Sequence, residues 1–185
     1  SGTESVLSPL PILQVILPLL AAPSCLILGR PALAWGFSFA TSAAAMLISM
    51  LLLQQVWLEG PISYFLGGWE APWGIEYRID LLNAFLLLIV SSLSTVVLAG
   101  TRQSVAAEVE PNKQTLFYVS WLLCLAGLLG ILATGDAFNV FVFLEVSSLS
   151  TYTLISLGRD RKALWASYQY LIVGTIGATF ILIGI

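Results

Sequence analysis

Charged residues are nearly absent from six long stretches of the sequence, and hydrophobic residues dominate each of them. Each stretch supplies the roughly 20 apolar residues that a helix needs to cross a hydrocarbon core about 30 Å thick. The pattern predicts an all-α polytopic membrane protein of about six transmembrane helices, folded as a single membrane domain over residues 1–185. The expected helices cover residues 8–29, 33–58, 81–101, 114–135, 137–158 and 163–185.

Composition supports a lipid environment for these stretches. Hydrophobic residues make up 58% of the chain and charged residues 9%. A soluble domain carries about 25% charged residues, because its surface must be solvated by water. This chain has too few charges to cover such a surface, so its main partner is the lipid bilayer.

The connections between the expected helices differ sharply in charge. All but one of the basic residues fall in the connections after the first, third and fifth helices, and Arg78 alone falls on the other side. Positively charged loops remain on the cytoplasmic side of a membrane. We therefore expect the N-terminus to lie outside and the basic loops to be cytoplasmic. These loops contain Arg30, Arg102, Lys113, Arg159, Arg161 and Lys162.

The longest outer connection, residues 59–80, has the pattern of a β-hairpin. Ile62 and Tyr64 alternate with other residues, Gly67 and Gly68 follow, and apolar residues alternate again up to Ile79. Two short extended arms around a glycine-rich turn favour a hairpin on the membrane surface. A plain ordered loop is an equally good interpretation of the pattern alone. At the next turn on this side, Asp136 is well placed to cap the fifth helix.

Composition also excludes several classes of site. The chain contains no histidine, which is the commonest ligand for haem iron, zinc and copper. Its two cysteines, Cys25 and Cys124, sit inside apolar stretches, where cysteine usually acts as a small hydrophobic residue. No basic patch with interleaved aromatic residues is present, so nucleic acid is not an expected partner. We expect neither a metal site nor a bound cofactor.

Glu145 is the one charged residue inside an otherwise apolar helix. It follows Ala137 by eight residues, which places it roughly 12 Å along the helix and near the middle of the bilayer. An ionised carboxylate at that depth costs several kcal/mol, so such residues usually have a function. Ser148, Tyr152 and Ser156 fall on the same helical face. This stripe predicts a proton relay to Glu145; the alternative is a structural glutamate that forms an interhelical hydrogen bond.

The last helix carries candidate packing and polar residues. Gly174, Gly177 and Ala178 place small residues three and four positions apart, which allows another helix to approach closely. Gln169 is a further proton-path candidate, although a structural hydrogen bond is the simpler interpretation. Every Lys and Arg lies at a membrane edge. If Glu145 is a working ionisable site, we therefore expect its cationic partner to come from another polypeptide or from a part that this chain lacks.

Three segments together resemble the antiporter-like subunits of complex I. The resemblance is greatest to the D subunit of Mrp-type cation/proton antiporters, and it extends to the corresponding subunits of membrane-bound hydrogenases. It covers the third to sixth helices well and the first two loosely. The segments are Leu66-Gly67-Gly68-Trp69 with Pro72, Gly74-Ile75 and Asp80; Gly135 to Glu145; and Tyr170 to Ala178.

The resemblance implies that Glu145 matches the family's key glutamate of the fifth helix, which works with a lysine on a broken seventh helix. It also implies a multi-subunit complex that moves protons, with Na⁺ as a candidate exchanged ion, across a bacterial inner membrane. The chain departs from the family in two ways. It stops within or at the end of the sixth helix, as a fragment, a split subunit or a partly traced subunit would, and it has Gln169 where many members have lysine.

Three functions are compatible with these features. The first is a subunit of a cation/proton antiporter, the second is a membrane subunit of a redox-driven proton pump, and the third is a non-conducting scaffold. In none of them is the chain expected to be an enzyme by itself. We rank the antiporter first, the redox-driven pump second and the scaffold third.

Overall fold

The computed structural model describes residues 9–65 and 76–185. The resemblance segment at 66–75 and the turn of the expected hairpin lie outside the described residues. The elements are α2 (Leu10–Leu28), α3 (Pro31–Glu59), β1 (Ile62–Phe65), β2 (Glu76–Ile79), α4 (Leu81–Glu108), the 3₁₀ helix η2 (Pro111–Lys113), α5 (Gln114–Ala133), α6 (Ala137–Ser156) and α7 (Arg161–Gly184).

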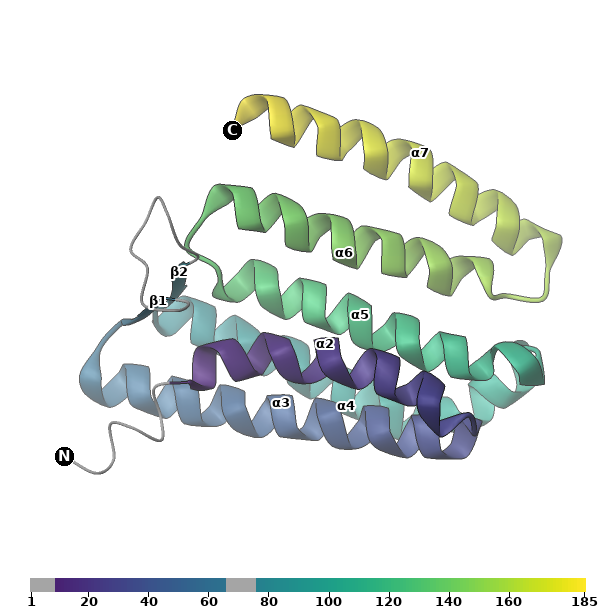
Figure 1. The fold of residues 1–185 in the computed structure, drawn as a ribbon, viewed down its shortest axis with the longest axis horizontal. Coiled ribbons are helices and arrows are strands. Elements are labelled where there is room, and N and C mark those ends of the chain that lie inside the picture. Colours follow the sequence, from purple (N-terminus) through teal and green to yellow (C-terminus); the bar gives the residue numbers. More distant parts are fainter. Residues whose placement is uncertain (1–8, 66–75) are drawn as a thin grey trace.

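Six of these helices are long and apolar enough to cross a membrane, which confirms the predicted fold class. They run antiparallel to their neighbours in the chain (Figure 1). Helices α2 to α5 form a bundle, α6 packs on α5, and α7 packs mainly on α6. Because it has few neighbours, α7 is the least buried of the six helices, with 11% of its apolar window buried.

Helix α4 continues to Glu108, past residue 101 where the sequence pattern ended the helix. The extension packs against the rest of the bundle: Val105 is buried in a cluster with Tyr118 and Leu122 of α5. The guanidinium of Arg102 lies over the ring of Trp35 on α3, 5.5 Å from its centroid. The extension therefore has a buried side and a charged side, which suits a helix leaving the hydrocarbon region.

The bundle interior is partly polar, and its surface is apolar. On α3 the buried side chains include Ser38, Ser42 and Ser49. The hydroxyl oxygens of Ser42 and Ser94 lie 2.9 Å apart, and Trp121 donates to Ser94 at 3.0 Å. Hydrogen bonds of this kind join helices in lipid, where burial of apolar surface gives no driving force. The outer faces expose large hydrophobic side chains instead.

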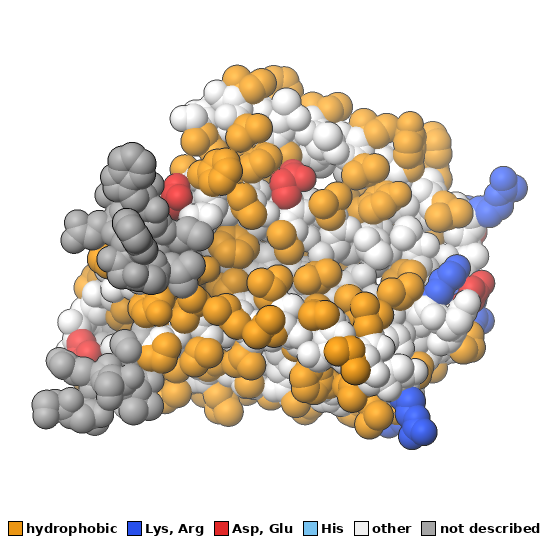
Figure 2. Space-filling model, viewed as in Figure 1, with side chains coloured by type: hydrophobic (Ala, Val, Ile, Leu, Met, Phe, Trp, Pro, Cys, Tyr) orange, Lys and Arg blue, Asp and Glu red, His pale blue; other side chains and the backbone are white. Residues whose placement is uncertain are grey.

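The charged side chains lie mainly at the ends of the helices (Figure 2). The basic residues of the connections after α2, α4 and α6 gather at one end, opposite the β-strands, and hydrophobic side chains cover the face between the two ends. The structure thus reproduces the charge separation that the sequence predicted.

β1 and β2 pair antiparallel, from Ile62 opposite Ile79 to Phe65 opposite Glu76, so the hairpin interpretation is confirmed over the plain loop. The strands are fixed to the helices beneath them. The backbone N–H of Gly135 donates to the carbonyl of Glu76 at 2.9 Å. Tyr77 forms a β-bridge with Thr134, and it is 5% exposed. Burial raises the pKa of Tyr77 above its ordinary value.

Candidate functional site

Glu145 lies on α6 at the crevice between α6 and α7. The structure places it, half-buried, beside Ser148 of its own helix and Tyr170 and Thr175 of α7. The crevice holds about 10 Å³, close to the lower limit for one water molecule, roughly 10–15 Å³. Leu149, Leu171 and Gly174 complete the lining, so the carboxyl-bearing residue and three hydroxyl-bearing residues share a small crevice with apolar neighbours. The hydroxyl of Thr175 donates to the carbonyl of Leu171 on its own helix at 2.7 Å.

The beginning of α6 fixes the depth of Glu145. The backbone N–H of Phe138 donates to the side chain of Asp136 at 3.0 Å, which confirms the predicted cap and starts the helix at Ala137. The Asp136 cap lies at the same end as the β-strands, and Ser156 ends the helix at the basic end. Glu145 is thus far from both ends of the helix.

Two glycines on α5 set the position of α6. A Cβ added at Gly127 would lie 2.7 Å from both the Cβ and the backbone nitrogen of Ser147, and one at Gly130 would overlap the ring of Phe143. Because α6 packs directly against these two positions, they determine how closely it approaches α5. Sequence reasoning missed them, although their spacing of three residues was a usable signal.

The predicted polar stripe is only partly gathered at the crevice. Ser148 lines it together with Glu145, but Tyr152 and Ser156 lie one and two turns farther toward the basic end and do not. The hydroxyl of Ser156 donates to the carbonyl of Thr153 at 2.7 Å. Both residues therefore remain predictions as parts of a proton path.

The candidates on α7 are divided between two faces. Gln169 is exposed and does not line the crevice, whereas Ser167 and Ala178 lie on the buried face. Gly174 lines the crevice, yet a Cβ at Gly174 or Gly177 would meet nothing within 4 Å. Close packing at these two glycines therefore remains a prediction for helices other than those described.

Thr175 is a crevice residue that sequence reasoning missed. The only signal for it was its position one residue after Gly174. That signal is weak, because the residues of α7 are apolar on most sides of the helix, so the sequence does not reveal which face contacts α6.

Among the described residues, no basic side chain lines the crevice. Over residues 9–65 and 76–185, the one salt bridge joins Lys113 and Glu110 at 3.3 Å, at the basic end. Arg159, also at that end, donates to the carbonyl of Val109 at 3.2 Å. A cation for Glu145 would have to come from outside the described residues.

The chain is similar to membrane subunits of two kinds of complex. It is 41% identical over 181 residues to NADH-quinone oxidoreductase subunit N of Desulforudis audaxviator, an alignment that covers 95% of this chain and 35% of that protein. It is 31% identical over 175 residues to the D subunit of the Na(+)/H(+) antiporter of Bacillus subtilis, covering 94% and 35%. No protein-family model matches the chain.

Solved structures agree with this relationship. A chain of the membrane-bound sulfane sulfur reductase, an archaeal respiratory membrane complex, matches with a TM-score of 0.84 and 30% identity, covering 96% of this chain and 36% of that chain. A chain of the Mrp complex from Dietzia sp. DQ12-45-1b matches with a TM-score of 0.82 and 25% identity, covering 97% and 33%.

The alignments cover about a third of the length of these relatives, 35% for each of the two proteins above. Over this third of the relatives' length, the chain is similar both in sequence and in the arrangement of its six helices. The protein is a multi-pass membrane protein, and its homologues include subunit N of NADH-quinone oxidoreductase and the D subunits of Na(+)/H(+) antiporters, of which it matches an N-terminal portion.

Proposed function

We propose that the chain is an ion-translocating subunit of a multi-subunit cation/proton antiporter, with Glu145 as its proton-carrying carboxylate. The observation that carries this proposal is the place of Glu145: mid-helix, half-buried, and in a crevice whose lining includes the hydroxyl-bearing residues Ser148, Tyr170 and Thr175. Intramembrane carboxylates in such surroundings are typical of proton relays. The relatives named as antiporter subunits support the same role.

Proton transfer would begin at the crevice. A water molecule there would take a proton from Glu145 or deliver one, and the hydroxyls of Ser148, Tyr170 and Thr175 can both donate and accept hydrogen bonds. Toward the basic end, Tyr152 and Ser156 continue along α6 as further candidates. Gln169 would contribute only if a neighbouring helix covered its exposed face.

A lysine from another subunit, or from a part of the protein outside the described residues, would control the charge of Glu145. Tyr170 and Thr175 are exposed, so a helix from outside the described residues could approach the crevice and bring an amine to it. An amine within about 4–6 Å would favour the ionised carboxylate, and its withdrawal would favour proton uptake.

The basic end would face the cytoplasm of a bacterial cell, with the protein in the inner membrane. Six of the seven basic residues, all but Arg78, are on the connections or helix ends at that end. Such a bias orients membrane proteins. The N-terminus and the β-strands would then lie outside, and Na⁺ is the candidate ion exchanged for protons.

Transport by the assembled complex in inverted membrane vesicles tests the proposal. Glu145→Gln keeps the shape and the hydrogen-bonding capacity of the side chain and removes its ability to carry a proton. It should reduce transport to background with the amount of complex unchanged, whereas Glu108→Gln, at the exposed basic end, should leave transport intact. Transport at the wild-type rate in Glu145→Gln would reject the proposal and favour a scaffold.

A redox-driven proton pump is the second candidate. It is favoured by the 41% identity to an NADH-quinone oxidoreductase subunit and by the likeness to a respiratory membrane complex. Copurification of iron–sulfur subunits with the chain would support it. Proton movement driven by a Na⁺ gradient alone would favour the antiporter.

A further inference from the structure

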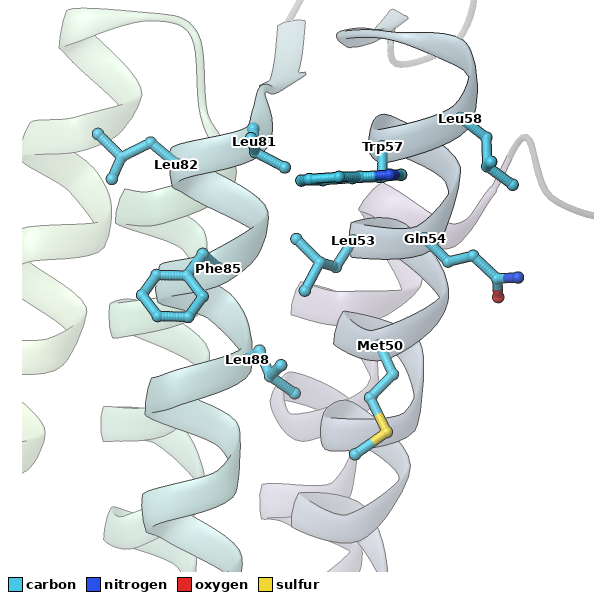
Figure 3. A pocket seen from close by; sticks show the side chains of 9 residues that line it. All are labelled: Met50, Leu53, Gln54, Trp57, Leu58, Leu81, Leu82, Phe85 and Leu88. Atoms are coloured by element: carbon cyan, nitrogen blue, oxygen red, sulfur yellow. The ribbon is translucent and has the colours of Figure 1, made fainter.

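The lateral face of α3 and α4 is hollowed near the end that carries the β-strands (Figure 3). A groove of about 860 Å³ lies between the two helices, within the size range of small-molecule sites, roughly 300–1,000 Å³. From Met50 to Trp57 it covers about 10 Å along the helix axis, or about two thirds of one leaflet's hydrocarbon depth. Its lining includes Met50, Leu53, Trp57, Leu81, Phe85 and Leu88.

A second hollow of about 530 Å³ continues from the first toward the helix ends. The two share Trp57, Leu81 and Leu82, and the second reaches Asp80 and Pro61 in the adjoining connections. The combined groove is therefore apolar along its length and has a carboxylate at one end. Gln54 also borders the first hollow, and its amide points away from α4 (Figure 3).

The charge around Asp80 is negative. Among the described residues this end of the bundle carries Glu59, Glu76, Asp80 and Asp136 against Arg78. One oxygen of Asp80 accepts from the backbone N–H of Asn83 at 2.8 Å, and no salt bridge to Asp80 occurs within the described segments. The carboxylate is exposed and can attract a cation at the level where the apolar groove ends.

Trp57 marks this level as the boundary between lipid tails and headgroups. It lies two residues before the end of α3, and its indole ring extends from α3 toward Leu81 of α4 (Figure 3). Tryptophan is enriched at this depth because its ring is apolar and its N–H is polar. A molecule lying in the groove would thus have its chains in the hydrocarbon and its polar group beside Asp80.

We propose that this groove binds a phospholipid with a primary ammonium headgroup, phosphatidylethanolamine. Its acyl chains lie along Leu53, Phe85 and Leu88, and its ammonium group pairs with the carboxylate of Asp80. An anionic phospholipid fits less well, because its headgroup carries a net negative charge and the surrounding acids repel it. The site is separate from the Glu145 crevice and does not depend on the proposed ion transport.

Lipid retention by the purified complex, containing the full-length chain, tests the proposal. The complex is equilibrated with equal amounts of phosphatidylethanolamine and phosphatidylglycerol bearing the same acyl chains, and the bound lipids are measured by native mass spectrometry. Asp80→Asn preserves the helix cap, since asparagine caps as well as aspartate, and removes the charge. It should lower the ratio of bound phosphatidylethanolamine to phosphatidylglycerol by up to about fivefold.

Filling the groove gives an independent test. Leu82→Trp adds bulk where the two hollows meet and should reduce retention of both lipids, while Val96→Trp, at an equally exposed position farther along α4, should not. An unchanged lipid ratio in Asp80→Asn, or equal retention in the two tryptophan variants, would overturn the proposal. So would a photo-crosslinker at position 85 that captures another subunit rather than lipid.

Discussion

The contact between α5 and α6 at Gly127 gives a sharp prediction about what holds Glu145 in place. In Gly127→Ala the new Cβ would lie 2.7 Å from the Cβ and backbone nitrogen of Ser147, where an ordinary contact needs about 3.5–4.0 Å. A rotamer change cannot relieve the overlap, because one of the two atoms is backbone. Helix α6 must move by about 1 Å to restore that spacing.

The magnitude follows from comparison with a glycine that has free space. A Cβ added at Gly100 on α4 meets nothing within 4 Å, so Gly100→Ala gains only the helix preference of alanine, up to about 1 kcal/mol. Gly127→Ala has the same gain and in addition the overpacking cost, about 1–3 kcal/mol. The free energies of unfolding of the two variants should therefore differ by about 1–3 kcal/mol.

Thermal unfolding of the purified complex measures this difference. On the scale of soluble domains of similar size, the melting temperature of Gly127→Ala should lie roughly 2–12 °C below that of Gly100→Ala. Transport should also fall in Gly127→Ala, because the displaced Ser147 lies two residues from Glu145. If the two variants melt at the same temperature, the reasoning about α5 and α6 is refuted.

Two further predictions concern the bundle interior and the β-strands. Ser94→Ala removes the acceptor of Trp121 and the partner of Ser42, so it should lower the free energy of unfolding by about 0.6–1.7 kcal/mol in thermal unfolding. The control Thr153→Val should be nearly neutral, because the hydroxyl of Thr153 donates within its own helix. Equal effects of the two changes would contradict the interhelical role of Ser94. Burial raises the pKa of Tyr77, so its contribution to stability is complete below about pH 10 and is lost as the pH rises through the raised pKa. Between about pH 9 and 11 the melting temperature should fall less in Tyr77→Phe than in the wild type. An equal fall in the two proteins would count against this burial effect.

The six helices were predictable because lipid imposes a simple rule on the sequence. A span must be long, apolar and almost free of charge, and those features need no tertiary information. The end of α4 was less predictable, because the residues after Thr101 are mixed in polarity. Their helical state depends on the packing of Val105 against α5, which only the fold provides.

The candidate site was predictable on one helix and less so on the other. Glu145 and Ser148 are three residues apart, and helix geometry alone places them on one face. Tyr170 and Thr175 reach the same crevice because of the way α7 packs on α6. That packing could not be derived from Gln169 or its neighbours, since the surface of α7 is apolar on most sides.

The buried serines of α3 show a signal that was present but unused. Ser38, Ser42 and Ser49 recur at helical spacing and all face the bundle interior. In a membrane protein the polar stripe of a helix, and not the apolar one, indicates the buried face. Their partners on α4 could not be assigned from spacing alone: the hydroxyl oxygen of Ser49 lies 3.1 Å from that of Ser91, and Ser42 pairs with Ser94.

The most direct test of proton carriage by Glu145 is an infrared difference spectrum of the complex during ion transport. We predict a carboxyl C=O band that changes as protons are taken up and released, and that disappears in Glu145→Gln while the complex stays intact. A band that persists unchanged in Glu145→Gln, in a complex that still transports, would contradict proton carriage by this residue.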